Sequence, residues 1–163
     1  MKTYKISVKF IVMTVFMIAI AVLAVSVGAS MIREDGIDGE NGMLGVLFLV
    51  VGASYVWSAW MLLMQMIVDK GIGMRLTEEG IEQTFVCVNL LAFMFVAPVS
   101  FIPWSAIGEI SERQGFYSAP VETDKVQAGF MGKFLLKLAG FGFGSGMVKP
   151  SVKREEIRRY SGK

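Results

Sequence analysis

Two long apolar segments dominate the first part of the chain. Residues 10–32 form an uncharged, mostly apolar run of 23 residues, and residues 43–68 form a second run of 26. A helix of 23 residues is roughly 35 Å long, which exceeds the roughly 30 Å thickness of the hydrocarbon core of a bilayer. The pattern therefore predicts a transmembrane helical hairpin. The first run is longer than the roughly 7–15 apolar residues of a signal peptide, so we expect it to be retained.

The connector between the two runs, residues 33–42, is polar and rich in turn signals. It holds three turn dipeptides of the Asp-Gly or Asn-Gly type, and one arginine against four acidic residues. Lys2, Lys5 and Lys9 precede the first run, with no acidic residue among them. Because Lys and Arg concentrate on the cytoplasmic side of membrane proteins, we expect both ends of the hairpin in the cytoplasm and the connector outside.

Small residues on the two runs suggest where the helices touch. Ala24 and Gly28 are four apart on the first run, and Ser54 and Ser58 are four apart on the second. This spacing lets helix backbones approach closely. We expect these two pairs to form a seam, either within the hairpin or between copies.

Beyond residue 68 the chain becomes more polar and its segments become shorter. Residues 74–81 read as a strand, a tight turn at Gly80 and the start of another strand. Residues 116–121 read as a short extended segment. Trp104 and Ile107 are expected to anchor the core of the sheet, with Glu109 pointing outward.

Helical patterns appear near the end of the chain. From residue 123 to residue 139 apolar residues recur at every fourth position (Val126, Phe130, Phe134 and Leu138), and Gly140 is a natural stop. A glycine-rich connector, residues 140–146, follows, and then a possible short strand at 147–148. We expect Ser151 to cap a final helix over residues 152–160.

Residues 85–102 form a third apolar stretch, of 18 residues, and they admit two interpretations. The length is sufficient for a third membrane span. A long β-hairpin, dipping toward the inner leaflet, is favoured because Pro98 would break a helix late in the run. A third span would also place ten Lys and Arg residues, from Arg113 to Lys163, outside the cell, against the positive-inside rule.

The order of these elements and two short motifs resemble a family of small, uncharacterised bacterial membrane proteins. The motifs are Leu-Thr-Glu-Glu-Gly-Ile at 76–81 and Ile-Pro-Trp-Ser-Ala-Ile at 102–107, and the family pattern is L-T-x-E-G-I followed by I-x-W-x-x-I. The resemblance implies a membrane α-helical hairpin followed by a small cytoplasmic α+β domain of the bacterial pleckstrin-homology-like (PH-like) type, an antiparallel sheet with a C-terminal helix. Gly80, Pro103, Trp104 and Ile107 are then structural motif residues. The stretch 85–102 departs from the family, whose hairpin is shorter and more polar.

The resulting domain boundaries follow from the hairpin. They are 1–9 for the cytoplasmic N-terminus, 10–32 for the first transmembrane helix, 33–42 for the external loop, 43–68 for the second transmembrane helix and 69–163 for the cytoplasmic PH-like domain.

The residues available for chemistry are few. The chain has no histidine, which excludes histidine-based acid–base catalysis and imidazole metal sites. Cys87 is the only cysteine, so neither an internal disulfide nor a thiolate zinc site can form. The adjacent carboxylates at 78–79 and 155–156 are expected to be solvated, and the glycine-rich connector lacks the lysine and helix start of a phosphate loop. We expect a protein that is not an enzyme and has no cofactor or metal.

Basic residues near the C-terminus are the candidate binding residues. The cytoplasmic leaflet is anionic, and each cation near it contributes about 1 kcal/mol. The chain has a net charge of only +2 and no nucleic-acid-binding motif, so nucleic acid is not an expected partner. The candidates for contact with lipid headgroups or a protein partner are Lys133, Lys137, Lys149, Lys153, Arg154, Arg158 and Arg159.

These observations suggest a function without fixing it. The first expectation is an accessory protein of the bacterial inner membrane, whose tethered domain binds a protein partner or anionic headgroups. The alternative is an immunity-type protein that neutralises a membrane-acting toxin. Membrane lipids and a protein, which is either a toxin or a second copy of the chain, are the expected partners.

Overall fold

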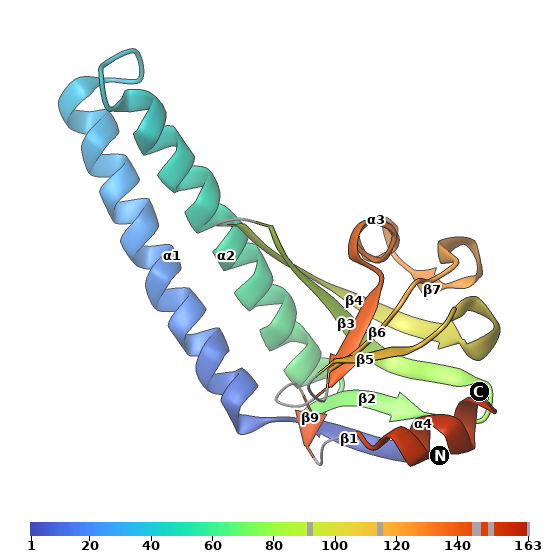
Figure 1. Ribbon diagram of the computed structural model, residues 1–163. Coiled ribbons are helices and arrows are strands. Elements are labelled where there is room, and N and C mark those ends of the chain that lie inside the picture. Colours follow the sequence, from blue (N-terminus) through green and yellow to red (C-terminus); the bar gives the residue numbers. More distant parts are fainter. Residues whose placement is uncertain (91–92, 114–115, 145–147, 150–151, 163) are drawn as a thin grey trace.

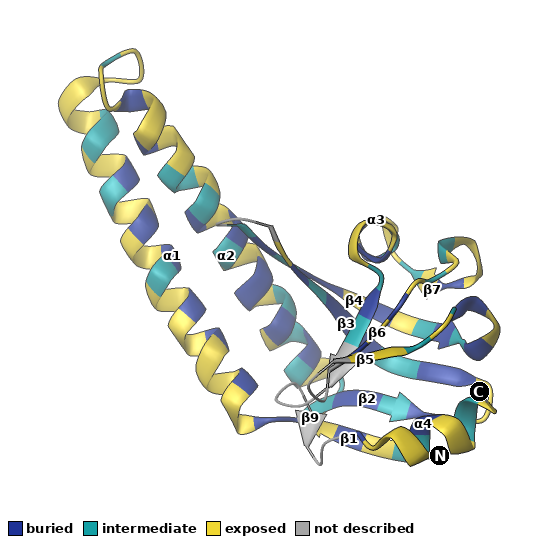
Figure 2. Cartoon of the chain, in the orientation of Figure 1, coloured by how far each residue is buried: buried dark blue, intermediate teal, exposed yellow. Residues whose placement is uncertain are grey.

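Two long antiparallel helices project from a β-rich domain in the computed structural model, which describes residues 1–90, 93–113, 116–144, 148–149 and 152–162 (Figure 1). The helices are α1 (Val8–Asp35) and α2 (Gly42–Val68). Both are long and apolar enough to cross a membrane, and only 28% of the most apolar window of each is buried. Most of their apolar surface therefore faces outward (Figure 2).

Glycines hold the two helices close together. A Cβ atom on Gly28 would lie 2.6 Å from the carbonyl oxygen of Gly45, and a Cβ on Gly45 would lie 2.9 Å from the carbonyl oxygen of Gly28. About two turns closer to the β-domain, Gly52 of α2 faces Ala21 of α1. Small residues thus form the seam, as expected, and Gly28 is among them. Its close partner is Gly45 and not the expected Ser58, whose hydroxyl bonds to Met94 of the β-domain.

The β-domain consists of two antiparallel sheets. The larger has the strand order β7-β4-β3-β2-β1-β9, and the smaller has the order β5-β6-β8. Two 3₁₀ turns, η1 (Trp104–Ala106) and η2 (Thr123–Lys125), interrupt the strands. The strands are β1 (Lys2–Ile6), β2 (Ile72–Leu76), β3 (Gly80–Leu90), β4 (Phe93–Pro103), β5 (Ser111–Arg113), β6 (Phe116–Ala119), β7 (Gln127–Ala128), β8 (Phe141–Gly144) and β9 (Val148–Lys149).

The helical pair is inserted between the first two strands of the larger sheet. β1 precedes α1, β2 follows α2, and the two strands pair antiparallel, with Lys2 opposite Leu76 and Tyr4 opposite Met74. Ser7 alone separates β1 from α1, and its hydroxyl accepts a hydrogen bond from the backbone N–H of Phe10 at 3.2 Å. The N-terminal segment, which the sequence marks only by its charge, is therefore part of the sheet.

The third apolar stretch forms a β-hairpin, as favoured, and not a membrane helix. β3 and β4 pair along their length, from Gly80 opposite Pro103 to Leu90 opposite Phe93. Alternate residues face two different cores: Val86 and Val99 point into the β-domain, whereas Phe85 and Val96 pack with the helical pair. A strand covered on both faces needs apolar residues at every position, and this explains why the stretch resembles a membrane span.

Cys87 lies on the helix-facing side of this hairpin, where burial raises the pKa of its thiol from 9.0 to about 11. Since only the thiolate reacts, the folded protein should be alkylated about a hundredfold more slowly than the unfolded chain at pH 8. The rate should climb with pH toward about 11. Iodoacetamide labelling of native and denatured protein from pH 8 to pH 11 measures this. A native rate that levels off near pH 9 would contradict the burial of this thiol.

The predicted helix over residues 123–139 is shorter than expected. Only α3 (Phe130–Ala139) is α-helical, because η2 and β7 occupy the preceding residues. Gly129 is extended before the helix, and Gly140, with a φ of 70°, ends it as predicted. Gly132, Leu135 and Leu136 form the buried face of α3, so the expected stripe of Phe130, Phe134 and Leu138 lies on the opposite, exposed face.

The described part of the glycine-rich connector contains a strand, while residues 145–146 lie outside the described residues. Phe141–Gly144 forms β8, which pairs with β6, and the Phe141 side chain is buried. The predicted short strand is β9, at Val148–Lys149, while Met147 lies outside the described residues. The final helix is α4 (Arg154–Ser161), and the proposed cap, Ser151, also lies outside them. Instead, the Glu156 carboxylate accepts a hydrogen bond from the Lys153 N–H.

Candidate functional site

The two sequence motifs meet in space around Trp104. The indole N–H of Trp104 donates to the carbonyl oxygen of Thr77 at 2.9 Å, and its backbone N–H donates to the carbonyl oxygen of Glu79 at 3.1 Å. Gly80 donates from its backbone N–H to the Thr77 hydroxyl oxygen. The motif at 102–107 therefore fastens the turn formed by the motif at 76–81.

The other motif residues have structural roles. A Cβ on Gly80 would lie 2.3 Å from the carbonyl oxygen of Ile102 and 2.8 Å from the Cα of Pro103, so a close backbone approach requires glycine here. Ile107 is 1% exposed and Trp104 is 6% exposed, whereas Glu109 is exposed, as expected. These residues build the domain and contain no reactive group.

The seven basic candidates do not form one surface. Lys133 and Lys137 lie on α3, on the side of the β-domain toward which the helical pair extends, whereas α4 lies at the opposite end of the domain, beside the start of β1 (Figure 1). Lys149 belongs to β9, and its side chain is outside the described part of the structure. The group on or just before α4 consists of Lys153, Arg154, Arg158 and Arg159.

Both ends of the chain are joined by a clasp at Glu156. The Lys2 ammonium group donates to Oε1 of Glu156, and the Tyr4 hydroxyl donates to Oε2 at 2.6 Å. Burial, aided by Tyr160, raises the pKa of Tyr4 to about 12, so the hydroxyl keeps its proton at neutral pH. Sequence reasoning missed this clasp because Glu156 looked like one half of a solvated acidic pair and Lys2 looked like an orientation signal only.

Removing the Tyr4 hydroxyl should loosen α4. We expect Tyr4→Phe to lower the free energy of unfolding by about 1–3 kcal/mol, because the Glu156 carboxylate loses a buried donor. Thermal unfolding of the purified protein in detergent, followed by near-ultraviolet circular dichroism, measures the loss. In a Glu156→Gln background the same substitution should cost less. Equal costs in both backgrounds would show that the two side chains are not coupled.

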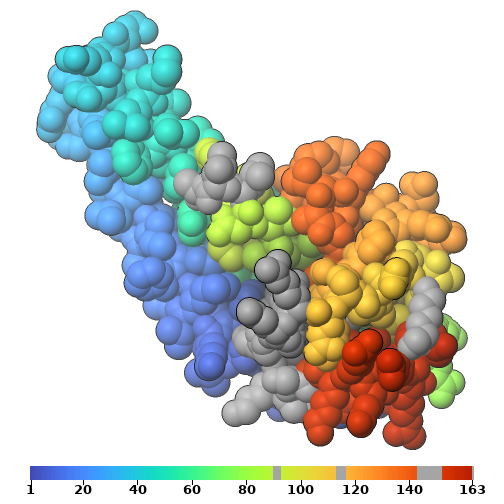
Figure 3. Space-filling model, viewed as in Figure 1, coloured from blue at the N-terminus to red at the C-terminus, as the bar shows by residue number. Residues whose placement is uncertain are grey.

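A concavity of about 420 Å³ lies between α4 and the β5–β6 hairpin. Figure 3 shows these two segments side by side, on the part of the molecule away from the helical pair. None of the described residues that line the concavity belongs to α1 or α2. The lining comprises Gly108, Glu109, Ile110, Glu112, Tyr117, Arg154, Ile157 and Arg158.

The concavity combines an apolar floor with charges of both signs. Ile157 is buried and Ile110 is partly buried, and the charged lining residues are Arg154 and Arg158 of α4, Glu109 and Glu112. Arg154 and Glu112 are 3.8 Å apart and largely exposed, so their pair contributes little to stability and its charges are accessible to a ligand.

Tyr117 supplies a hydroxyl at the base of this concavity. Burial, reinforced by the neighbouring Glu112 carboxylate, raises the pKa of Tyr117 above its usual value. The hydroxyl is therefore a neutral hydrogen-bonding group at physiological pH and not a base. Among the described residues, no cluster of three metal-ligating side chains is present. This arrangement can hold a short peptide or a small charged group.

Comparison with protein-family models, with curated proteins and with solved structures finds no match for this chain. Its fold and its site therefore rest on the geometry above.

Proposed function

We propose that this chain is a membrane-anchored binding protein without enzymatic activity. In this proposal, α1 and α2 span the cytoplasmic membrane of a bacterium, and the β-domain lies in the cytoplasm with both termini. The order of an apolar helical pair, an antiparallel sheet and a C-terminal helix is compatible with a PH-like domain on a membrane hairpin. The binding partner is a protein whose peptide segment occupies the concavity between α4 and β5–β6.

The observation that carries the proposal is how the β-domain is built onto the base of the helical pair. The strand β1 enters α1 through Ser7, and α2 leads into β2 through Asp69, Lys70 and Gly71. The Ser58 hydroxyl of α2 also donates to the carbonyl oxygen of Met94 in β4 at 2.6 Å. An outward-facing apolar helical pair with a domain fixed to one end is the architecture of an anchor.

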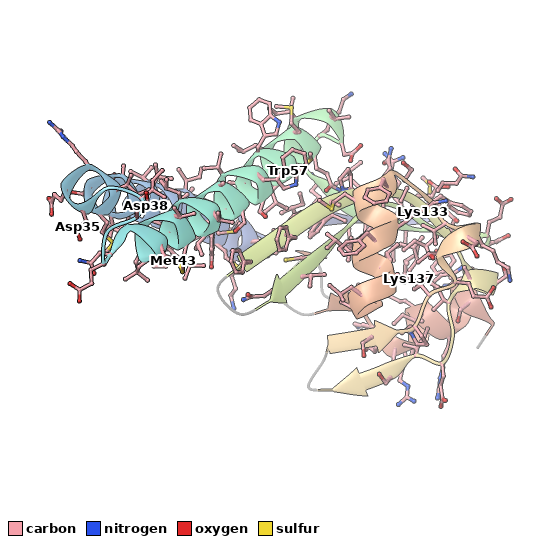
Figure 4. All side chains as sticks on the ribbon, turned by 90° about the horizontal axis from the view of Figure 1, so that it is seen from above. Asp35, Asp38, Met43, Trp57, Lys133 and Lys137 are labelled. Atoms are coloured by element: carbon pink, nitrogen blue, oxygen red, sulfur yellow. The ribbon has the colours of Figure 1, made fainter. Side chains whose placement is uncertain are left out.

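The distribution of charge supports the proposed orientation. Between residues 34 and 69 there is no Lys or Arg, whereas Lys2, Lys5 and Lys9 lie on the side of the β-domain. The tip between the helices contains Asp35 and Asp38 (Figure 4). By the positive-inside rule, this tip faces the outside.

Cysteine labelling tests the anchor. In a Cys87→Ser background, Asp38→Cys in the tip should react with a membrane-impermeant maleimide in intact cells. Glu155→Cys, which is exposed on α4, should react only after the cells are opened. Labelling of both positions in intact cells would overturn the orientation, and release of the protein by alkaline carbonate would overturn the membrane anchor itself.

Photo-crosslinking tests the binding surface. A photoreactive amino acid at Arg158, which lines the concavity, should trap a discrete partner protein in living cells. The matched control is position 159, because Arg159 is an exposed neighbour on the same helix that does not line the concavity. Identical adducts at the two positions, or none at position 158, would overturn the assignment of this surface.

A further inference from the structure

The outer face of α3 is apolar and uncovered. Phe130 is 86% exposed, Phe134 52% and Leu138 54%, and the rings of Phe130 and Phe134 stack with their centroids 6.5 Å apart. Met131 at the edge of this face is also exposed. Three large apolar side chains on one face of a short helix form a contiguous patch, and such patches mark contact surfaces.

The inner face of α3 is fixed to the hairpin below it. Leu135 and Leu136 are each 1% exposed, and a Cβ on Gly132 would lie 3.0 Å from the carbonyl oxygen of Pro98 in β4. The close approach at Gly132 prevents the helix from rolling its apolar stripe inward. The exposed face is therefore a fixed part of the fold.

The height of the β-domain along the helical pair relates this face to the bilayer of the proposed anchor. Ser58, which bonds to Met94 near the tip of the β3–β4 hairpin, lies ten residues before the end of α2, which is about 15 Å along the helix. The 28 residues of α1 span about 42 Å, roughly 12 Å more than a hydrocarbon core needs. In the proposed anchor, with that excess length at the domain end, the side of the β-domain nearest to the connector between α1 and α2 lies at the boundary of the bilayer.

Figure 1 shows α3 on the side of the β-domain toward which the helical pair extends. In Figure 4, seen from that side, no described part of the chain lies over α3, and Lys133 and Lys137 are visible along it. The uncovered side of α3 thus faces the region into which the helical pair extends.

The charges on α3 match an anionic surface. Lys133 and Lys137 are the only charged residues of α3, and helix geometry places both along one edge of the apolar stripe. A lysine in this place buries its aliphatic stem and extends its ammonium group to the headgroups. An apolar face bordered by lysines is the pattern of a helix that lies in the plane of a membrane interface.

We infer that α3 is a second membrane contact: it lies flat on the inner leaflet, with Phe130, Phe134 and Leu138 among the acyl chains and Lys133 and Lys137 at anionic headgroups. This inference rests on the proposed membrane anchor and names lipid as a partner of the domain. Together with the helical pair, α3 fixes the tilt of the domain, so that the concavity at α4 points away from the membrane.

Fluorescence in proteoliposomes tests this inference on the full chain. In a Cys87→Ser background, Leu138→Cys and, separately, Phe130→Cys are labelled with the environment-sensitive dye NBD. Vesicles of phosphatidylcholine and phosphatidylglycerol then carry a doxyl quencher high on the acyl chain. Both labels should emit at shorter wavelength and be quenched several-fold more than the same dye at Glu155→Cys.

Reversing the charge of the two lysines on α3 provides a second test of the same inference. The double substitution of Lys133→Glu and Lys137→Glu should reduce quenching of the label at position 138 in vesicles with phosphatidylglycerol, and should change it little in pure phosphatidylcholine. Labels at 130 and 138 that behave like the label at 155 would overturn the inference. A blue shift that disappears when the protein is diluted in lipid would also overturn it, because a second copy would then cover α3. If carbonate extracts the protein, the anchor has failed; if the protein stays inserted and the α3 labels remain unquenched, only this inference has failed.

Discussion

Gly28→Leu is expected to separate the helical pair. Its Cβ would lie 2.6 Å from the carbonyl oxygen of Gly45, and a backbone oxygen cannot move aside as a flexible side chain can. We expect a loss on the order of 3 kcal/mol, at the upper end of the cost of overpacking, because the whole of α2 must shift. Unfolding by increasing sodium dodecyl sulfate in mixed micelles, followed by circular dichroism, measures the loss.

The adjacent residue provides the control for this substitution. Ala29 is exposed on α1, so Ala29→Leu introduces the same side chain one position away from the seam. It should leave the midpoint of unfolding almost unchanged. If both variants unfold at the midpoint of the wild type, then close contact at Gly28 and Gly45 does not hold the pair together.

Trp104→Ala is expected to be the most damaging single substitution in the β-domain. It removes a buried aromatic ring from the main core and leaves the Thr77 carbonyl oxygen without its indole donor. Truncations of this size cost about 3–5 kcal/mol. Because total stability is only about 5–15 kcal/mol, we expect the domain to unfold well below the temperature of the wild type.

Two further variants separate the causes of this loss. Trp104→Phe keeps an aromatic ring but removes the N–H donor. The lost hydrogen bond should lower the free energy of unfolding by about 1 kcal/mol, in addition to the loss caused by the smaller ring. Trp60 is 55% exposed on α2, so Trp60→Ala should cost no more than about 0.5 kcal/mol. Equal losses for Trp104→Ala and Trp60→Ala, measured by near-ultraviolet circular dichroism during heating, would contradict the anchoring role of Trp104.

The parts of the fold that the sequence predicts correctly are those with a strong local signal. Few structures other than a membrane span require apolar helices of this length. The turn at Gly80 needs a residue without a side chain because the backbone approaches closely, and the helix end at Gly140 needs one that adopts a positive φ. The β-hairpin at 85–102 was favoured by Pro98 and by charge distribution. The sequence does not explain why the hairpin is apolar at nearly every position. The structure does, because each face of the hairpin packs into a different hydrophobic core.

The errors concern contacts between distant parts of the chain. An apolar stripe on α3 has the same spacing whether it faces a core or a membrane, so Phe130, Phe134 and Leu138 carry no information about direction. The clasp joins Lys2 to Glu156, 154 positions apart, and no local pattern predicts such a pair. The basic candidates are close in sequence, yet the fold places α3 and α4 at opposite ends of the domain, and no local pattern predicts that separation.

The placement of the helical pair between β1 and β2 has a consequence for biosynthesis. β1 is made first but cannot pair with β2 until the sixty-five residues between Ile6 and Ile72 have been translated. Closing so long a loop by chance is slow. In the proposed anchor, α1 and α2, with 28 and 27 residues, cross the membrane twice, return the chain to its starting side and bring the strand ends together. Correct insertion then becomes a precondition for the first pairing of the sheet. If the hairpin fails to insert, β1 stays unpaired, and its free backbone N–H and C=O groups can then pair with another chain and cause aggregation.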